Sequence, residues 1–540
     1  MVTSAFCRRW WCSTQSACAY RPAVSATTRH RALSRGWFRG PLWSCEEWTM
    51  NVDWKRLGDR AFGVAEWMSM PLPRKNPGLP PGPKMPSSLQ TMWWLIWPNP
   101  FLESCRERYG VRFTLDLLTQ PPMVFLSGPG EVRELMKAAP DVVLPGAGGS
   151  VLRTALGDSS IITLDGDGHL EHRRLMAPAF HGAKIERLAP LMESVTDRYL
   201  ARMPRDEQFP IHHDLQALTL EIIMRATFGL PEGSRLNRIS ELIRSAIMFA
   251  ESPLFALPAT RTMPVIRWAW SSFNDTLQRV DHEIYALIAE RREARVTGTD
   301  DSDGVDLLSV LLDAHHDDGA PMSDVEIRDE LLTMVVAGHE TTASQIGWAL
   351  LLLARNPAVQ RRLYEELTEG EDGGHDYLQA TIQEVLRLDM ATPHPEPRVV
   401  AHPIIIGGVE YPAGVTLQAH GHLIHHDPNV YPDPEVFRPE RFLGSRPVPY
   451  SWIPFGGGRR RCIGSNLAML EMRIVLRRVL LHCEVRQVGA GVERGQRRAI
   501  TSSPAGGAVV VLHDRPHSIE LRTPTSAQRS DALRCPVAHP

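Results

Sequence analysis

The chain has 540 residues, of which 43% are hydrophobic and 22% charged, a composition typical of globular proteins. Its 59 Lys and Arg nearly balance its 62 Asp and Glu, for a formal net charge of −3, so no global polycation is available to bind nucleic acid. No stretch approaches the roughly 18 consecutive apolar residues of a membrane span. Nucleic-acid binders of the histone type and proteins with a transmembrane anchor are therefore excluded.

The first 49 residues differ in composition from the rest. They are rich in Arg, Ser, Thr and Trp and carry no acid before Glu46, a composition that fits either an organellar transit peptide or translated upstream sequence. The second interpretation is favoured because no sustained amphipathic period runs through them, with Met50 as a working start. It predicts a bacterial cytoplasmic protein, whereas a transit peptide would predict a mitochondrial one. Residues 50–78 form a linker, since the run 71–86 is rich in Pro.

Residues 79–525 read as one large domain, followed by a polar tail at 526–540. Helical periodicity predicts several helices, at 101–109, 183–203, 215–228, 240–250, 273–295, 378–388 and 466–481. A capping box at Ser323 and Glu326 starts another helix, which Asn356 and Pro357 end. Strands are predicted at 111–118 and 123–127 and as short pieces between 395 and 450. Three prolines break 253–270, and 297–306 is a loop. The prediction is a mainly α fold with small β-sheets.

The strongest chemical signal is the segment 455–464. Four glycines surround Cys462, and the helix predicted at 466–481 follows directly. A helix N-terminus and three neighbouring arginines, 459–461, are expected to lower the pKa of this thiol. A thiolate there would act as a nucleophile or a metal ligand. The alternative is a small buried cysteine, which does not require this density of glycine.

This segment resembles the cysteine-ligand loop of the cytochromes P-450, the haem-thiolate monooxygenases. The residues that match the family's pattern are Phe455, Gly456, Gly458, Arg460, Cys462 and Gly464. The resemblance implies that Cys462 is the axial ligand of heme b and that Arg460 contacts a haem propionate. It implies that Phe455 packs beside the sulfur. The implied fold is a triangular helical prism with a β-rich subregion, in a bacterial-type soluble member.

Three further segments appear in the order that the family requires. Glu384 and Arg387 share a helix face at i and i+3, a pattern that alone fits any solvated surface pair. Arg441, in a segment matching the family's PxRF, is implied to join them in a structural triad. Within the helix that starts at Ser323, the resemblance implies that Glu340 and Thr341 deliver protons, and that Ala337 and Gly338 line an oxygen groove. The alternative is an ordinary helix with back-bonded threonines.

Basic residues elsewhere are candidate partners of the haem propionates. His169 and Arg173 lie at i and i+4, hence on one helix face, and Arg398 matches a strand arginine of the family. Buried carboxylates need cationic partners. The cluster of His422, His425 and His426 is interpreted as structural, since no complete zinc ligand set accompanies it. Cys105 and Cys483 are interpreted as core residues on apolar helix faces.

The predicted reaction is insertion of one oxygen atom of O2 into a hydrophobic substrate, by hydroxylation or epoxidation. The alternatives are a non-oxygenating or peroxide-driven haem-thiolate enzyme, a haem sensor and a cysteine hydrolase. Electrons are expected from a ferredoxin or flavodoxin with its NAD(P)H-dependent reductase, docked on a basic face; that face comprises Arg459, Arg461, Arg473, Arg477 and Arg478. The apolar segments 140–162 and 253–270 suggest a lipid-like, steroid or terpenoid substrate.

Overall fold

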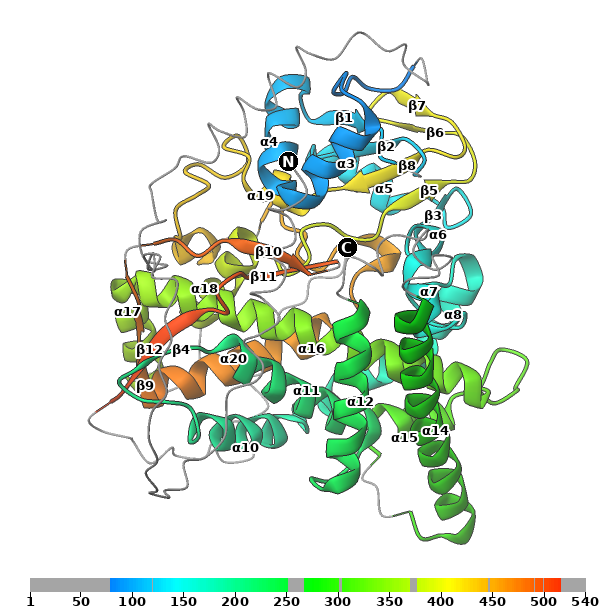
Figure 1. Ribbon diagram of the computed structural model, residues 1–540, viewed down its shortest axis with the longest axis vertical. Helices are drawn as coiled ribbons and strands as arrows, with labels where there is room; N and C mark the ends of the chain where they lie inside the picture. Colours follow the sequence, from blue (N-terminus) through cyan, green and yellow to red (C-terminus); the bar gives the residue numbers. More distant parts are fainter. Residues whose placement is uncertain are drawn as a thin grey trace, which may run out of the picture. The chain divides into compact units, whose positions relative to one another are not determined.

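Figure 1 shows the computed structural model of the chain, which describes residues 78–118, 120–250, 267–300, 304–369, 376–444, 447–489, 491–498 and 500–515. These residues belong to one compact unit, Lys55–Pro540. The predictions for residues 1–77, for most of 253–270 and for 516–540 lie outside the described residues.

Helices make up most of the described chain, as the sequence predicts. The longer ones are α3 (Ser87–Ile96), α4 (Pro98–Tyr109), α5 (Pro129–Lys137), α8 (Gly166–Met176), α10 (Ala189–Leu200), α11 (His212–Phe228), α12 (Ser234–Ala250), α14 (Arg267–Thr297), α15 (Leu307–Asp313), α16 (Asp324–Arg355), α17 (Pro357–Glu369), α18 (Asp376–Leu388) and α20 (Ser465–His482). The capping box at Ser323 and Glu326 is present at the start of α16. The single helix predicted at 183–203 is wrong in one respect. The chain forms a short α9 (Ala183–Glu186) and then α10, which has Pro190 in its first turn, where proline is tolerated.

The strands of the described residues form four small sheets. The largest has the order β1-β2-β8-β5-β3, built from β1 (Arg112–Leu115), β2 (Met123–Leu126), β3 (Val143–Leu144), β5 (Arg398–Val400) and β8 (Thr416–Ala419). The other three join β4 (Gln208–Pro210) and β9 (Cys483–Gln487) to β12 (Val509–Asp514), β10 (Gly495–Arg498) to β11 (Thr501–Pro504), and β6 (Ile404–Ile406) to β7 (Val409–Tyr411). The predicted hairpin is present as antiparallel β1 and β2. The mainly α fold with small sheets is therefore confirmed.

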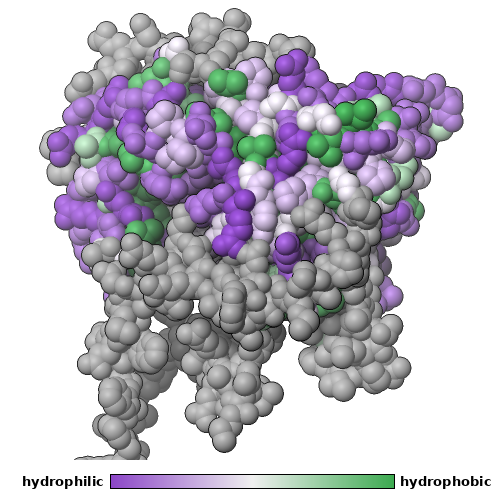
Figure 2. Space-filling view, turned by 90° about the horizontal axis from the view of Figure 1, so that it is seen from above, coloured by the Kyte–Doolittle hydropathy of each residue, from purple (hydrophilic) through white to green (hydrophobic). Residues whose placement is uncertain are grey.

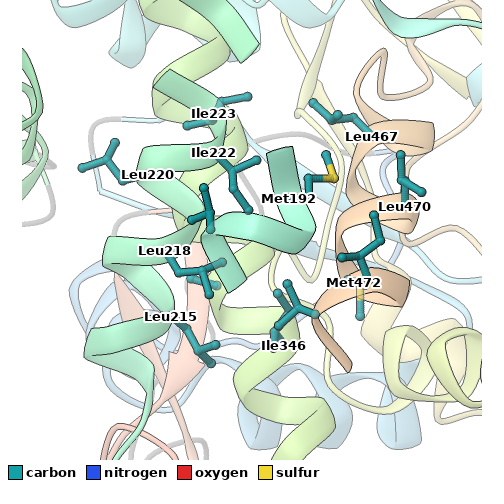
Figure 3. Packing of buried hydrophobic residues seen from close by; sticks show 14 of the residues in the cluster. Met192, Leu215, Leu218, Leu220, Ile222, Ile223, Ile346, Leu467, Leu470 and Met472 are labelled. Carbon is teal, nitrogen blue, oxygen red and sulfur yellow. The ribbon is translucent and has the colours of Figure 1, made fainter. Parts of the chain in front are cut away.

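The principal core lies among α10, α11, α16 and α20. Figure 3 shows their side chains meeting, with Met192 of α10 between α11 and α20. Met192, Ile222 and Ile346 are fully buried there, and burying such a side chain contributes about 1.5–3 kcal/mol. Because α16 runs through this core, almost every one of its residues from 327 to 354 is buried. The few exceptions become important at the site.

The two outlying cysteines are buried, but only one lies on a helix. Cys105 is on the buried face of α4. Cys483 follows the last residue of α20 and begins β9, with extended backbone angles. The prediction that Cys483 lies on an apolar helix face is therefore wrong, because α20 ends at His482.

The surface in Figure 2 is largely hydrophilic where it is coloured, with separate hydrophobic patches. Within the described ranges, no helix combines the length and the hydropathy needed to cross a membrane.

Candidate functional site

The loop that presents Cys462 is held close to α5 by glycines. Gly456 and Gly458 both have φ of +65°, which L-residues with side chains rarely adopt. A Cβ on Gly458 would lie 2.1 Å from the carbonyl oxygen of Met136 in α5. The amide of Cys462 donates to the carbonyl of Phe455 over 2.9 Å and closes the loop. Gly456 and Gly458 are therefore needed because the loop turns tightly and packs against α5.

The thiol of Cys462 is surface-accessible and at the same time surrounded by protein. Its residue is exposed, yet burial is the main influence on its pKa and raises it. A hydrogen bond from the backbone of Gly464 and the charges of Arg173 and Arg461 act the other way. The prediction of a lowered pKa is therefore wrong for the thiol as it stands, because burial outweighs the cations. The thiol is therefore accessible although protein atoms surround it.

Cationic side chains lie near this thiol and near Glu396, whose charge acts on Cys462, Arg173 and Arg398 alike. Arg398, at the start of β5, is buried, and among the described residues its guanidinium donates one hydrogen bond, to the carbonyl of Leu135 over 2.8 Å. The guanidinium of half-buried Arg173 in α8 makes no hydrogen bond or ion pair with any described residue. Burial lowers the pKa of both, that of Arg398 to about 10, and the carboxylate of Glu396 opposes this shift in each. His169 is buried, and its pKa is lowered to about 3 by burial and then by Arg460 and Arg173.

Arg460 already has several hydrogen-bond partners within the protein, unlike an arginine that is free to bind a propionate. Its guanidinium donates to the carbonyls of Ile161 (3.0 Å) and Leu164 and to the Asp165 carboxylate (3.0 Å). Asp165 in turn accepts from the amides of residues 146 and 147, at the start of the short helix α6 (Pro145–Gly148), over 2.6 and 2.8 Å. The cysteine loop is thus clamped to the apolar segment 140–162. The propionate role of Arg460 stays a prediction.

Glu384, Arg387 and Arg441 form one buried ionic cluster. Glu384 and Arg387 of α18 are fully buried, and Arg387 donates to both carboxylate oxygens over 2.7 and 2.8 Å. Arg441 adds a contact of 3.2 Å from its Nε. Burying an ion pair costs free energy of desolvation, and removing one partner of a buried pair strongly destabilises the fold.

His425 links this cluster to the cysteine loop, a role that the sequence did not reveal. The Arg387 guanidinium donates to the carbonyl of His425 over 2.8 Å, and the His425 ring contacts the Arg387 carbonyl at 3.1 Å. The other ring nitrogen accepts from the amide of Ile453, two residues before Phe455, over 3.0 Å. The cluster therefore fixes the start of the loop that carries Cys462. No described group of His, Cys, Asp and Glu has the arrangement of a metal site.

One stretch of α16 is accessible within an otherwise buried helix. Between 327 and 354, the residues that are not buried are 336–338, 341 and 352. The Thr341 hydroxyl donates to the carbonyl of Ala337 over 2.7 Å, the back-bonding that Thr commonly makes within helices. A Cβ on Gly338 would lie 3.0 Å from Ile223 of α11. This glycine therefore serves close helix packing, and only its backbone is available to line a groove.

Glu340 is directed away from Thr341. Its carboxylate accepts from the Gln216 amide over 2.6 Å and from the Ser344 hydroxyl over 3.2 Å. Burial raises its pKa, an effect that Gln216, Arg498 and Ser344 oppose. The predicted acid–alcohol pair is adjacent in sequence, but the structure shows no hydrogen bond between its two side chains.

The family model for "Cytochrome P450" matches residues 80–508. The chain belongs to this family. It is 32% identical over 464 residues to the Mycobacterium tuberculosis protein named "Putative cytochrome P450 135B1", covering 85% of this chain and 96% of that protein. It is 35% identical over 445 residues to "Putative cytochrome P450 138" of the same species, covering 81% and 97%.

Solved P450 structures share the fold. The structure titled "Retinoic acid bound cyanobacterial CYP120A1" aligns with a TM-score of 0.69 at 24% identity, covering 81% of this chain and 99% of that one. The "cytochrome P450DA heme domain" aligns with the same TM-score at 21% identity, covering 81% and 98%. Membership of the family implies a haem with a cysteine thiolate ligand.

The residues of this P450 fit that cofactor. A haem with a thiolate ligand needs a cysteine within reach of its iron and cations near its propionates. Cys462 provides an accessible thiol, and Arg173 has guanidinium nitrogens without a partner in the described chain. Arg398 has donors left beyond its one bond to Leu135. These donors therefore fit a haem-thiolate site.

Proposed function

We propose that this P450 is a haem-thiolate monooxygenase that inserts one oxygen atom of O2 into a hydrophobic organic substrate. The observation that carries the proposal is the enclosed yet accessible Cys462, in a loop braced by a buried ionic cluster. The family and the fold support a haem-thiolate oxidoreductase in general, and the type of reaction and the class of substrate are what we propose in addition.

Cys462 would ligate the iron of heme b, and Arg173 and Arg398 would hold the propionates, with His169 beside them. Haem supplies the oxygen-activating chemistry when bound. Arg460 would act on the same edge, and its bond to Asp165 would keep the segment 140–162 closed over it. Phe455, Gly456 and Gly464 would shape the loop around the sulfur.

Glu340 and Thr341 would provide protons for oxygen activation. Thr341 lies on the accessible stretch of α16 and uses its hydroxyl hydrogen on the Ala337 carbonyl, which leaves its oxygen free to accept a hydrogen bond from water. Glu340 is buried with a raised pKa, so its carboxyl can retain a proton closer to neutral pH than a solvated one. A bridging water would be needed between the two side chains.

A separate ferredoxin or flavodoxin would supply electrons, and Arg459 is the best candidate on the docking face. Arg459 is exposed and makes no hydrogen bond or ion pair with described residues. Arg478, by contrast, donates to both oxygens of Asp197 in α10, and burial lowers the pKa of Arg477. Charge reversal at Arg478 would therefore disturb the fold, whereas Arg459 tests docking alone.

The test is the origin of the oxygen in the product. The reconstituted holoenzyme, supplied with a ferredoxin, its reductase and NADPH, is screened against lipid-like, steroid and terpenoid compounds by spin-state shift. Binders are then turned over under 18O2. A monooxygenase places one labelled atom in the product, and Cys462→Ser abolishes it. Product that forms only with added peroxide, or without label from 18O2, would contradict the proposal and favour a peroxide-driven or non-oxygenating enzyme.

A further inference from the structure

A chain of polar side chains leads from Glu340 into α11, away from the accessible stretch of α16. The Ser344 hydroxyl lies 3.2 Å from one Glu340 carboxylate oxygen. The His212 Nε2 atom lies 3.3 Å from the Ser344 oxygen and 3.6 Å from that same carboxylate oxygen. Gln216 occupies the other carboxylate oxygen over 2.6 Å. His212 and Ser344 are 2% and 0% exposed, so these contacts are made in the protein interior.

The burial of Glu340 makes a supply path necessary. Glu340 is 5% exposed, and a carboxyl that gives up a proton there cannot regain one directly from bulk solvent. On the α11 side, His213 is exposed and follows His212 directly in the chain. The polar chain therefore ends at the first residue of α11, next in sequence to an exposed residue.

Each member of this chain has the chemistry that its place requires. A hydroxyl and a neutral imidazole each donate and accept at once, so both can pass a proton on. An amide nitrogen only donates, so Gln216 holds the carboxylate and does not relay. The pKa of His212 is lowered to about 3, mainly by burial and also by the charges of Arg498, His339 and His213. The ring is therefore neutral, which a relay needs.

We propose that His212 and Ser344 return protons to Glu340 after it has supplied them to the oxygen site. This inference rests on the proposed function. The Ser344 hydroxyl gives its proton to Glu340 Oε1 as it takes one from His212 Nε2, and His212 Nδ1 takes one from water. One proton enters for each that leaves, and no net charge accumulates. His212 and Ser344 are positioning residues, since they act through Glu340.

The test follows proton exchange at Glu340 in the ferric holoenzyme without turnover. The infrared carbonyl band of its protonated carboxyl is identified by its loss in Glu340→Gln. Its exchange rate is then measured on mixing with deuterated water. We expect exchange to slow at least about tenfold in Ser344→Ala and in His212→Gln, since a positioned proton-transfer group contributes about 10²–10⁴-fold. Ser344→Thr keeps the hydroxyl and should restore exchange.

Thr333→Val is the matched control. Thr333 is a fully buried hydroxyl of the same helix that contacts Ser160 and the Asp329 carbonyl. Equal exchange in Ser344→Ala, Thr333→Val and the unmodified protein would overturn the proposal, as would slowing of equal size in both variants. Absence of any protonated-carboxyl band would overturn it too.

The carbon monoxide spectrum separates this inference from the proposed function. Each variant is first shown to give the thiolate-type band of the unmodified protein. If the unmodified protein gives no such band, the proposed function fails. If the band is present and exchange is unaffected in Ser344→Ala and His212→Gln, only the relay fails.

Discussion

Replacing Glu384 by Gln should destabilise the protein far more than the same change at an exposed glutamate. Glu384 accepts from two nitrogens of Arg387 over 2.7 and 2.8 Å and from Arg441 over 3.2 Å, and it is fully buried. Gln removes the charge that both arginines face and turns an amide NH2 toward them. Breaking a buried pair in this way costs about 3–5 kcal/mol. The His425 link to Ile453 should loosen with it, so haem retention should fall as well.

Glu290→Gln is the matched control. Glu290 also pairs with an arginine, Arg235, but its side chain is 60% exposed, and exposed pairs contribute about 0–1 kcal/mol. Urea denaturation of each holoprotein, followed by far-ultraviolet circular dichroism and by Soret absorption, gives the change in the free energy of unfolding. If Glu384→Gln costs no more than Glu290→Gln, or if its haem content is unchanged, the account of the ionic cluster as the brace of the loop is refuted.

Three further predictions concern other parts of the site. Gly458→Ala should abolish haem binding, because the added Cβ would collide with the backbone of α5. Gly408 has φ of +74° with open space around it, so Gly408→Ala should lower the free energy of unfolding by only about 1–2 kcal/mol. Haem content and denaturation midpoints of the two variants test this difference. Burial lowers the pKa of His172, but the hydrogen bond and charge of Glu330 outweigh it and raise the pKa above 6.5, and burial raises the pKa of Glu330 too. At these two groups the folded state thus binds more protons than the unfolded state. Stability should therefore fall as pH rises, from about 4.5 for Glu330 and from about 6.5 for His172, through their raised values. His172→Gln should flatten this dependence above pH 6.5; a pH series of denaturation midpoints checks it, and an unchanged slope would contradict it. Arg459→Glu should slow reduction by an acidic ferredoxin in stopped-flow traces, most strongly at low ionic strength, and equal rates would exclude a docking role.

The sequence predicts the elements whose signals are local. The capping box at Ser323, the hairpin before α5 and the glycine-rich loop before α20 each depend on residues close together in the chain, and each is present. The helix at 183–203 was predicted without a break, because its hydrophobic period continues across the turn between α9 and α10.

Features set by tertiary packing could not be predicted in the same way. His425 contacts the cysteine loop through Ile453, 28 residues away, and no spacing rule connects them. The pKa of Cys462 rises because burial outweighs the neighbouring arginines, and burial is not visible in a list of neighbouring residues. The direction of the Glu340 side chain depends on Gln216, more than a hundred residues earlier in the chain.

The most direct test of the central claim is the carbon monoxide difference spectrum of the dithionite-reduced protein. The account predicts a thiolate-type shifted Soret band, its loss in Cys462→Ser and its retention in Cys483→Ser, which removes a buried thiol elsewhere. A histidine-type band in the unmodified protein, or a thiolate-type band that survives Cys462→Ser, would contradict the assignment of Cys462 as the ligand. Well-folded protein that binds no haem would contradict the account as a whole.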